Sequence, residues 1–207
     1  MTTPHGAVHI RSFCRPDDIK RYAFDGQFNV SADYKPLYTR RESLEKIAEQ
    51  ADANVVLALD ATEKIIGFGV LDDPDPQERW MALGAGLIME LNAIEVSRSW
   101  RSAGIAPRIL KSLLDHPRIE DIIVYLVGYS WTWDLKGTGK SAGAYRQTLI
   151  NIFEPIGFRQ YETNEPNVCL KPENFLMGRI GSNVSPQIID RFKWLRYDLN
   201  LWSWSVG

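Results

Sequence analysis

Residues 94–106 read IEVSRSWRSAGIA, and this stretch decides the fold. It begins as a β-strand, passes through small residues after Trp100, and continues after Gly104 with apolar residues at helical spacing. Successive backbone N–H groups at such a turn, joined to the positive end of a helix, form a site for a diphosphate, and Arg101 adds a nearby cation. The alternative interpretation is an ordinary connection between a strand and a helix.

The composition limits the class of protein. The chain has 207 residues, of which 44% are hydrophobic and 24% charged, so it is long and apolar enough for one domain with a buried core. Its 24 Lys and Arg residues balance 26 Asp and Glu residues, which excludes a sequence-wide field for nucleic acid or an anionic membrane. Cys14 and Cys169 lack the spacing of a zinc site or a disulfide scaffold. With no apolar segment typical of a signal peptide or a membrane span, we expect a cytoplasmic protein.

Hydrophobic periodicity predicts interleaved strands and helices around the deciding stretch. The predicted strands cover 8–13, 54–59, 65–71, 87–96, 121–128, 158–162 and 175–180. The predicted helices cover 39–51, 105–116, 144–153 and 186–197. The short link between the second and third strands is typical of a hairpin, so an α/β fold that begins with an antiparallel sheet is expected.

The deciding stretch also resembles a known motif. Arg101-Ser102-Ala103-Gly104-Ile105-Ala106 follows an apolar-x-Val strand end at 94–96, with Trp100 at an aromatic position. This pattern is similar to motif A of the GNAT acetyltransferases. Ile156-Gly157-Phe158 resembles the Gly-Phe that ends a later helix in the same superfamily.

The resemblance covers roughly residues 8–180 and implies a fold, a co-substrate and a reaction. The fold is a central, mostly antiparallel sheet, splayed between its fourth and fifth strands, with flanking helices. The co-substrate is acetyl-CoA, and no metal is required. We expect a GNAT domain over residues 1–181 and a C-terminal helical extension and tail over 182–207, which includes Trp202 and Trp204.

Within the superfamily, the chain resembles the acetoin-utilisation protein-lysine acetyltransferases, whose substrate is acetyl-CoA synthetase. The segments behind this resemblance are Glu78-Arg79-Trp80, residues 90–97, residues 131–139, Tyr145-Arg146 and residues 177–181. The resemblance implies an enzyme that acetylates a lysine of a metabolic enzyme, with acetyl-CoA synthetase as the partner, and lowers the activity of that enzyme. The oligomeric state is left open.

Acetylation of a lysine requires a base. The side chain has a pKa of about 10.4, so its deprotonation at pH 7 costs about 4–5 kcal/mol, and a carboxylate within reach can take the proton. Glu90 and Glu95 lie on one predicted strand, and their odd spacing places them on opposite faces. Glu90 precedes Val96 by six residues, the offset of the base in the histone-acetylating members, so the resemblance implies Glu90 as the base. A solvated carboxylate is the alternative for Glu90. Glu95 is interpreted as structural, with the alternative that Glu95 is the catalytic base in place of Glu90.

One position departs from the superfamily. Many members place a tyrosine four residues before the Gly of Gly-Phe to protonate the leaving thiolate, and this chain has Phe153 there. Direct attack without a dedicated acid is therefore expected, with Tyr145 or Tyr129 as weak substitutes. The resemblance also implies that the backbone N–H of Val96, or that of its neighbour, polarises the thioester carbonyl.

The expected site residues fall into two groups. The cofactor-binding residues are Ile94, Val96, Arg101, Ser102, Ala103, Gly104, Ile105 and Ala106. The residues expected to bind the acceptor are Trp131, Trp133, Asp134 and Tyr145. The tryptophans would form apolar walls for a lysine stem, and Asp134 would contact a basic neighbour on the substrate. The alternative is that both tryptophans belong to the core and that Asp134 caps the following turn.

Other functions fit less well. Residues 137–141, GTGKS, lack the first glycine of a phosphate loop, and the three histidines have no metal-ligand spacing. An acetyltransferase for a small amine and a non-catalytic acyl-CoA sensor that binds a partner remain as alternatives.

Overall fold

The computed structural model describes residues 1–29 and 40–199. Thr39, where the first predicted helix begins, and the tail with Trp202 and Trp204 lie outside the described residues. The contacts divide the chain into two compact units, which are described separately. The first unit contains Met1–Asp72, Leu91–His116 and Asp134–Gly139, and the second contains Asp73–Glu90, Pro117–Trp133 and Lys140–Gly207.

The sheet of the first unit consists mainly of antiparallel strands. Its order is β1 (Thr2–Thr3), β2 (Gly6–Arg11), β4 (Asn54–Asp60), β5 (Lys64–Asp72) and the later part of β6 (Ile88–Val96). The short strand β3 (Ala23–Phe24) pairs in parallel with β5. Strands β4 and β5 form the predicted hairpin, with a β-bulge between Ala58 and Leu59.

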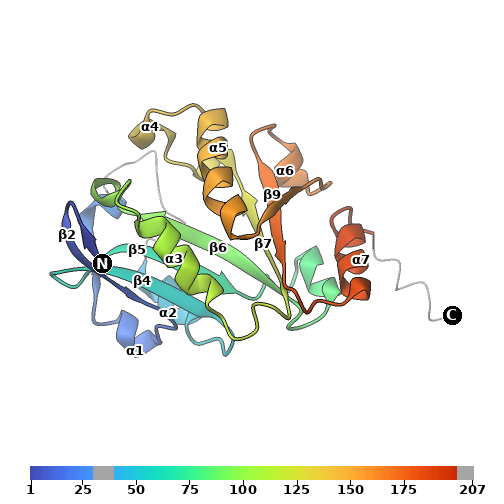
Figure 1. Cartoon of the computed structure of the whole chain (residues 1–207), viewed down its shortest axis with the longest axis horizontal. Helices are drawn as coiled ribbons and strands as arrows, with labels where there is room; N and C mark the ends of the chain where they lie inside the picture. Colours follow the sequence, from blue (N-terminus) through green and yellow to red (C-terminus); the bar gives the residue numbers. More distant parts are fainter. Residues whose placement is uncertain (30–39, 200–207) are drawn as a thin grey trace. The chain divides into compact units, whose positions relative to one another are not determined.

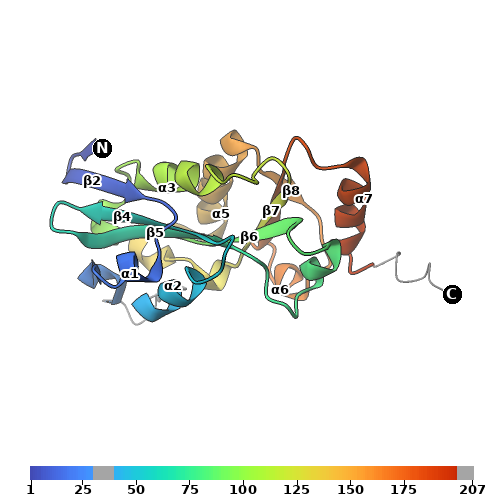
Figure 2. The same ribbon diagram turned by 90° about the horizontal axis from the view of Figure 1, so that it is seen from below.

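Helices cover both faces of this sheet. Figure 2 shows α1 (Pro16–Ile19) and α2 (Arg41–Ile47) on one face and α3 (Ile105–Leu114) on the other. Short helical segments complete the unit: η1 (Gly26–Asn29), η3 (Arg98–Trp100) and α4 (Leu135–Thr138). The face under α1 and α2 is filled by a cluster that includes Ile19, Leu44, Leu57, Phe68 and Val70.

Helix α3 packs closely against the opposite face because β5 carries a glycine beneath it. A Cβ atom on Gly69 would lie 2.5 Å from Ile109 Cγ2 and 2.6 Å from Leu113 Cδ1. Ile109 and Leu113 are both fully buried. Any larger residue at position 69 would push the helix, and with it the turn that precedes the helix, away from the sheet.

The second unit contains the remaining strands. The beginning of β6 pairs in parallel with β7 (Ile123–Gly128), through Ile88–Glu90 and Ile123–Tyr125. Strand β9 (Phe175–Ile180) is antiparallel to β7, and β8 (Arg159–Tyr161) is antiparallel to β9. The helical segments are η2 (Arg79–Leu83), η4 (Ser130–Thr132), α5 (Ala142–Phe153), η5 (Glu154–Ile156), α6 (Pro166–Cys169) and α7 (Pro186–Leu195).

The core of the second unit is aromatic. Trp80 of η2 lies 4.7 Å from Tyr125 of β7 and 5.8 Å from Phe192 of α7, measured between ring centroids. Helix α7 lies beside η2 in Figure 1, and Arg191 donates a hydrogen bond to the carbonyl of Ala82. Predicted helix 186–197 therefore packs against the body of this unit.

The structure confirms an α/β fold with a mostly antiparallel sheet and flanking helices. The sequence prediction missed the short segments η2, α4 and α6, which have too few residues to show a helical period. Helix α2 also ends at Ile47, before the predicted end at residue 51.

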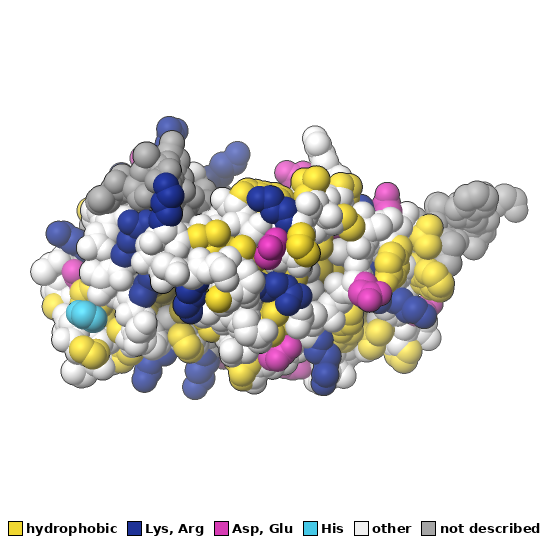
Figure 3. Space-filling model, turned by 90° about the horizontal axis from the view of Figure 1, so that it is seen from above, with side chains coloured by type: hydrophobic (Ala, Val, Ile, Leu, Met, Phe, Trp, Pro, Cys, Tyr) yellow, Lys and Arg dark blue, Asp and Glu magenta, His cyan; other side chains and the backbone are white. Residues whose placement is uncertain are grey.

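The surface and the thiols agree with the composition. Lys and Arg side chains lie among Asp and Glu side chains on the face shown in Figure 3. Both cysteines are free thiols: Cys14 is buried, and burial raises the pKa of its thiol to about 11, whereas Cys169 is exposed. Among the described residues, no helix is both long and apolar enough to cross a membrane.

The close approach of α3 predicts the effect of one substitution. Gly69→Ala would place a methyl group within contact distance of Ile109 and Leu113, so we expect the free energy of unfolding to fall by about 1–3 kcal/mol. Gly26→Ala is the control, because a Cβ at Gly26 meets no described atom within 4 Å, and its effect should stay within about 0.5 kcal/mol. Urea unfolding measures both values, and equal midpoints for the two variants would contradict the packing argument.

Candidate active site

The turn between β6 and α3 has the backbone geometry of an anion site. Ser102 and Gly104 have positive φ angles of 63° and 74°, and Gly104 is the N-cap of α3 without a side-chain cap. Both residues are exposed, and a Cβ at Gly104 would meet no described atom within 4 Å. The backbone at Gly104, directly before the first N–H groups of α3, is therefore open to solvent. Such an arrangement accepts a phosphate or diphosphate.

A buried carboxylate holds this turn in place. Asp134, only 1% exposed, accepts hydrogen bonds from Arg98 Nε at 2.7 Å and Arg98 Nη2 at 2.6 Å. Arg101 Nη1 also donates to it at 2.6 Å, and Arg101 Nε donates to the carbonyl of Val96 at 3.1 Å. Arg98 and Arg101, which precede and follow Trp100 in the chain, thus both pair with the Asp134 carboxylate.

The same carboxylate caps α4. The backbone N–H of Gly137 donates to Asp134 Oδ1 at 2.9 Å. Burial opposes ionisation of Asp134, but the hydrogen bonds from Arg98, Arg101 and Gly137 outweigh it and lower the pKa of the carboxyl to about 2. Asp134 is therefore ionised at neutral pH and enclosed by its own partners.

This position corrects the expectation that Asp134 contacts a basic residue of a protein substrate. A carboxylate that is 1% exposed is not accessible to a second protein, and the capping alternative describes what the structure shows. Arg101 lies in the turn as expected, but its guanidinium is ion-paired to Asp134. Arg98 was not among the predicted site residues, although its place three residues before Arg101 is visible in the motif.

Further contacts support the turn from the N-terminal segment of the same unit. The ring of Trp100 meets His5 edge-on, with centroids 5.6 Å apart. The backbone N–H of Ser99 donates to Gln27 Oε1 at 2.8 Å, and Ser97 Oγ donates to Asp25 Oδ1 at 2.8 Å. These long-range partners have no sequence signal.

In the second unit, the predicted base Glu90 lies beside the hydrogen-bonded pair of Tyr125 and Glu78. It is half-buried and stands opposite Tyr125 in the register of β6 and β7. Tyr125 is fully buried, and its hydroxyl donates to Glu78 Oε2 at 2.8 Å. Burial and the nearby carboxylates of Glu90 and Glu78 raise the pKa of Tyr125. Glu95 is also half-buried and belongs to the first unit.

The four aromatic residues after β7 form two stacked pairs. Trp131 is 48% exposed and stacks on Tyr129, with centroids 4.8 Å apart and planes at 9°. Trp133 is half-buried and stacks on Tyr145 at 5.3 Å and 13°. Burial, together with the charges of Glu165 and Glu90, raises the pKa of Tyr129 to about 12. Trp131 is thus open to solvent, whereas Trp133 is the more buried of the two tryptophans.

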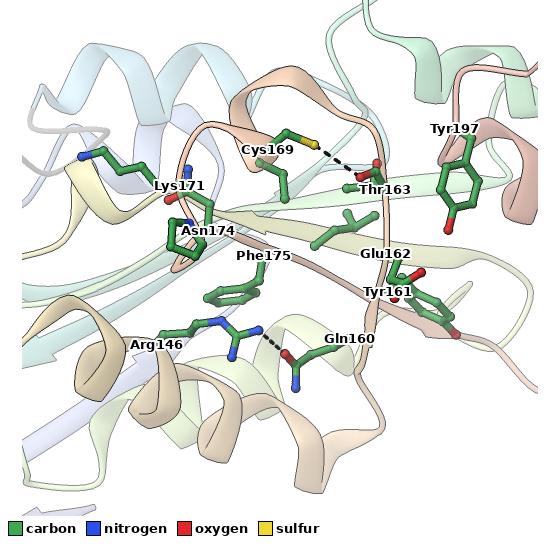
Figure 4. A pocket seen from close by; sticks show the side chains of 13 residues that line it. Arg146, Gln160, Tyr161, Glu162, Thr163, Cys169, Lys171, Asn174, Phe175 and Tyr197 are labelled. Atoms are coloured by element: carbon green, nitrogen blue, oxygen red, sulfur yellow. Dashed lines mark hydrogen bonds between the residues drawn. The ribbon is translucent and has the colours of Figure 1, made fainter.

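A cavity of about 660 Å³ lies beside the second pair. Its wall includes Phe175, which lies 6.0 Å from Trp133 between ring centroids. Figure 4 shows the Phe175 ring over the guanidinium of Arg146, which donates to Gln160 Oε1. Cys169 also lines this cavity, and its Sγ lies 3.5 Å from the carbonyl oxygen of Thr163.

Phe153 occupies the position where the resemblance would place a catalytic tyrosine. It is 3% exposed and packs on Phe158, with centroids 5.6 Å apart. No hydroxyl is available from this position. Within residues 1–29 and 40–199, no group of three His, Cys, Asp or Glu side chains is arranged to hold a metal ion.

The ion pairs of Asp134 predict a pH-dependent contribution to stability. Because the pKa of Asp134 is about 2 in the folded protein and about 4 in an unfolded chain, its stabilisation is present above pH 4 and is lost as the pH falls through 2. We expect Asp134→Asn to lower the free energy of unfolding at pH 7 by about 2 kcal/mol, a difference that shrinks toward pH 2.

The matched control for this prediction is Asp17→Asn, whose carboxylate is 88% exposed and pairs with Lys20. Its effect should be below about 0.5 kcal/mol at either pH. Urea unfolding at several pH values measures the differences. A constant difference between wild type and Asp134→Asn across this range would refute the linkage.

Comparisons with known proteins identify the family. No protein-family model matches the sequence. The chain is 30% identical over 197 residues to the acetoin utilization protein AcuA of Bacillus licheniformis and 31% identical over 197 residues to that of Bacillus subtilis, covering 95% of this chain and 92% of each relative.

Solved structures agree with this relationship. A crystal structure of the acetoin utilization protein from Exiguobacterium sibiricum matches with a TM-score of 0.85 and 29% identity, over 94% of this chain and 90% of that one. A putative phosphinothricin N-acetyltransferase, 13% identical, shares the fold with a TM-score of 0.53, over 84% of this chain and 98% of that one. The chain therefore belongs to the AcuA family of GNAT N-acetyltransferases.

Proposed function

We propose that this enzyme transfers the acetyl group of acetyl-CoA to a lysine of a metabolic enzyme, acetyl-CoA synthetase, and thereby lowers the activity of that enzyme. The observation that carries the proposal is the exposed turn at Ser102–Gly104, with positive φ angles and an uncapped helix N-terminus. The name of the relatives, acetoin utilization protein, fits an enzyme that regulates acetyl-CoA metabolism.

In this proposal, the turn holds the diphosphate of acetyl-CoA. The backbone N–H groups around Ala103, Gly104, Ile105 and Ala106 bind its oxygens, and the small side chains leave room for the phosphates. The strand end at Ile94 and Val96 carries the backbone groups that align the pantetheine arm, and the N–H of Val96 polarises the thioester carbonyl. Arg98, Arg101 and Asp134 keep the turn in the shape that this binding needs.

The chemistry proceeds by direct attack. Glu90 takes a proton from the lysine ammonium, and the resulting amine attacks the carbonyl carbon of the thioester. The C–N bond forms, the C–S bond breaks, and the second lysine proton ends on the departing thiolate. A CoA thiolate leaves without a dedicated acid, which is consistent with the buried Phe153. Tyr129, whose pKa is raised to about 12, keeps its proton at neutral pH.

The acceptor is a protein lysine in this proposal. Trp131, stacked on Tyr129 and 48% exposed, offers a flat apolar surface for the methylene groups of the lysine or its neighbours. Trp133 and Tyr145 form a second stacked aromatic pair in the same unit. Glu90 supplies negative charge that favours an approaching ammonium ion over a neutral side chain.

Acetyl-CoA binding can be tested by adding one charge to the turn. Asp and Asn both tolerate the positive φ of Ser102, so Ser102→Asp and Ser102→Asn should fold equally well. Ser102→Asp places a carboxylate where the diphosphate binds, and we expect its dissociation constant for acetyl-CoA to rise at least about tenfold, or about 1.4 kcal/mol. Ser102→Asn should bind nearly as the wild type does. Titration calorimetry measures both, and equal affinities would remove the turn from the binding site.

The catalytic assignment is tested by mass spectrometry of purified acetyl-CoA synthetase incubated with enzyme and acetyl-CoA. Glu90→Gln should reduce the rate of lysine acetylation by about 10²–10⁴-fold, because the substitution removes the base and keeps the shape. Glu95→Gln is the matched control on the same strand and should retain most of the rate. A large loss of rate in Glu95→Gln with a nearly normal rate in Glu90→Gln would make Glu95 the base.

The same assay with spermidine as acceptor distinguishes the alternatives. Faster transfer to spermidine than to the protein would indicate a small-amine acetyltransferase. Binding of acetyl-CoA without transfer to either acceptor would indicate the non-catalytic sensor, which the missing tyrosine at Phe153 also fits.

A further inference from the structure

The segment Glu78-Arg79-Trp80 belongs to the sequence resemblance but takes no part in the chemical steps above. Glu78 precedes η2 as its N-cap residue, and Trp80 lies inside η2. Trp80 is 3% exposed and packs on the ring of Tyr125, while Glu78 accepts the hydrogen bond of the Tyr125 hydroxyl at 2.8 Å. The segment therefore fixes both the ring and the hydroxyl direction of one buried tyrosine.

The other side of Tyr125 faces the proposed base. Glu90 is the register partner of Tyr125 in the parallel pair of β6 and β7, so the two side chains stand on the same face of the sheet. A phenol has one proton to donate and two lone pairs that accept. Since the proton is donated to Glu78, the oxygen is available to accept a proton from Glu90 when Glu90 is in its acid form.

Glu90, Tyr125 and Glu78 differ in their exposure to solvent. Glu90 is half-buried, Tyr125 is fully buried, and Glu78 is exposed to solvent. We propose that Tyr125 and Glu78 form a proton relay that carries the proton taken up by Glu90 from the acceptor ammonium out to solvent. The proposal rests on Glu90 acting as the base of the acetyl transfer proposed above.

The proton balance of the reaction requires such an exit. A lysine ammonium loses two protons when it becomes a neutral amide, one of which ends on the CoA thiolate. The other is on Glu90 and must leave before the next turnover. In the relay, Glu90 gives its proton to the Tyr125 oxygen as the Tyr125 hydroxyl gives its own to Glu78, and Glu78 then releases a proton to water.

The electrostatics of Tyr125 favour a concerted transfer. Burial and the two carboxylates raise its pKa, so the phenolate is strongly disfavoured and the tyrosine stays neutral throughout. Trp80 restricts the ring, which keeps the hydroxyl between its two partners. Tyr125 is thus a positioning and relay residue, not the base itself.

The test compares Tyr125→Phe, Glu78→Gln and the control Asp73→Asn in the full-length enzyme, with acetyl-CoA and acetyl-CoA synthetase as substrates. Asp73 is an exposed carboxylate of the loop that leads to Glu78. Tyr125→Phe keeps the buried ring, and Glu78→Gln changes an exposed side chain. We expect both to lower kcat about tenfold with unchanged KM values, while Asp73→Asn keeps the wild-type rate.

A chemical readout separates a relay from a structural role. Raising the concentration of imidazole at constant pH should restore kcat of Glu78→Gln, because a diffusible base replaces the exposed proton acceptor, and it should leave the wild type unchanged. Calorimetry with acetyl-CoA checks that the variants retain the folded binding site.

The outcomes distinguish the relay from the function on which it rests. Wild-type kcat in Glu78→Gln and Tyr125→Phe, together with an inactive Glu90→Gln, would overturn the relay and leave the base in place. A loss of rate in Glu78→Gln that imidazole does not restore would also overturn the relay. An active Glu90→Gln would overturn the base and the relay together, and absence of acetylation by the wild type would overturn the proposed substrate.

Discussion

The pairing of one buried carboxylate with two arginines is the constraint on which the proposed coenzyme site depends. Asp134 reaches Arg98 and Arg101, which lie more than thirty positions earlier in the chain, and it also caps α4. Together these contacts fix the backbone between Trp100 and Gly104, where two residues have positive φ. An unpaired carboxylate at 1% exposure would be costly, so the arrangement is stable only as a whole. The shape of the turn is therefore set by contacts between side chains and backbone of the protein itself.

Much of this architecture could be predicted because the periodic signals are strong. The apolar run of residues 122–127 predicted a buried strand, and β7 is buried along most of its length. The spacing after Gly104 predicted α3, which begins at Ile105. The segments η2, α4 and α6 escaped prediction because five or fewer residues show no period. They are held by tertiary contacts such as the cap of Asp134 and the packing of Trp80, which arise only in the folded chain.

The site residues divide in the same way. Motif residues 101–104 form the expected turn, because a strand, a glycine with positive φ and a helix leave the backbone little choice. The interpretation of Asp134 as a surface contact was wrong, since its partner Arg98 comes from a distant segment and spacing does not reveal such pairs. The link between Glu78 and Tyr125, 47 positions apart, was hidden for the same reason. The sequence thus predicted the local backbone geometry, but it did not predict the ionic and hydrogen-bonded partners.

The two free thiols differ in a way that has a practical consequence. The thiol of Cys14 is buried and its pKa is about 11, so little thiolate forms at neutral pH and the group is shielded from reagents. Cys169 is exposed and lines the cavity beside Phe175. The native chain therefore offers a maleimide dye one preferred attachment point, and fluorescence from that point would report directly on what enters the cavity.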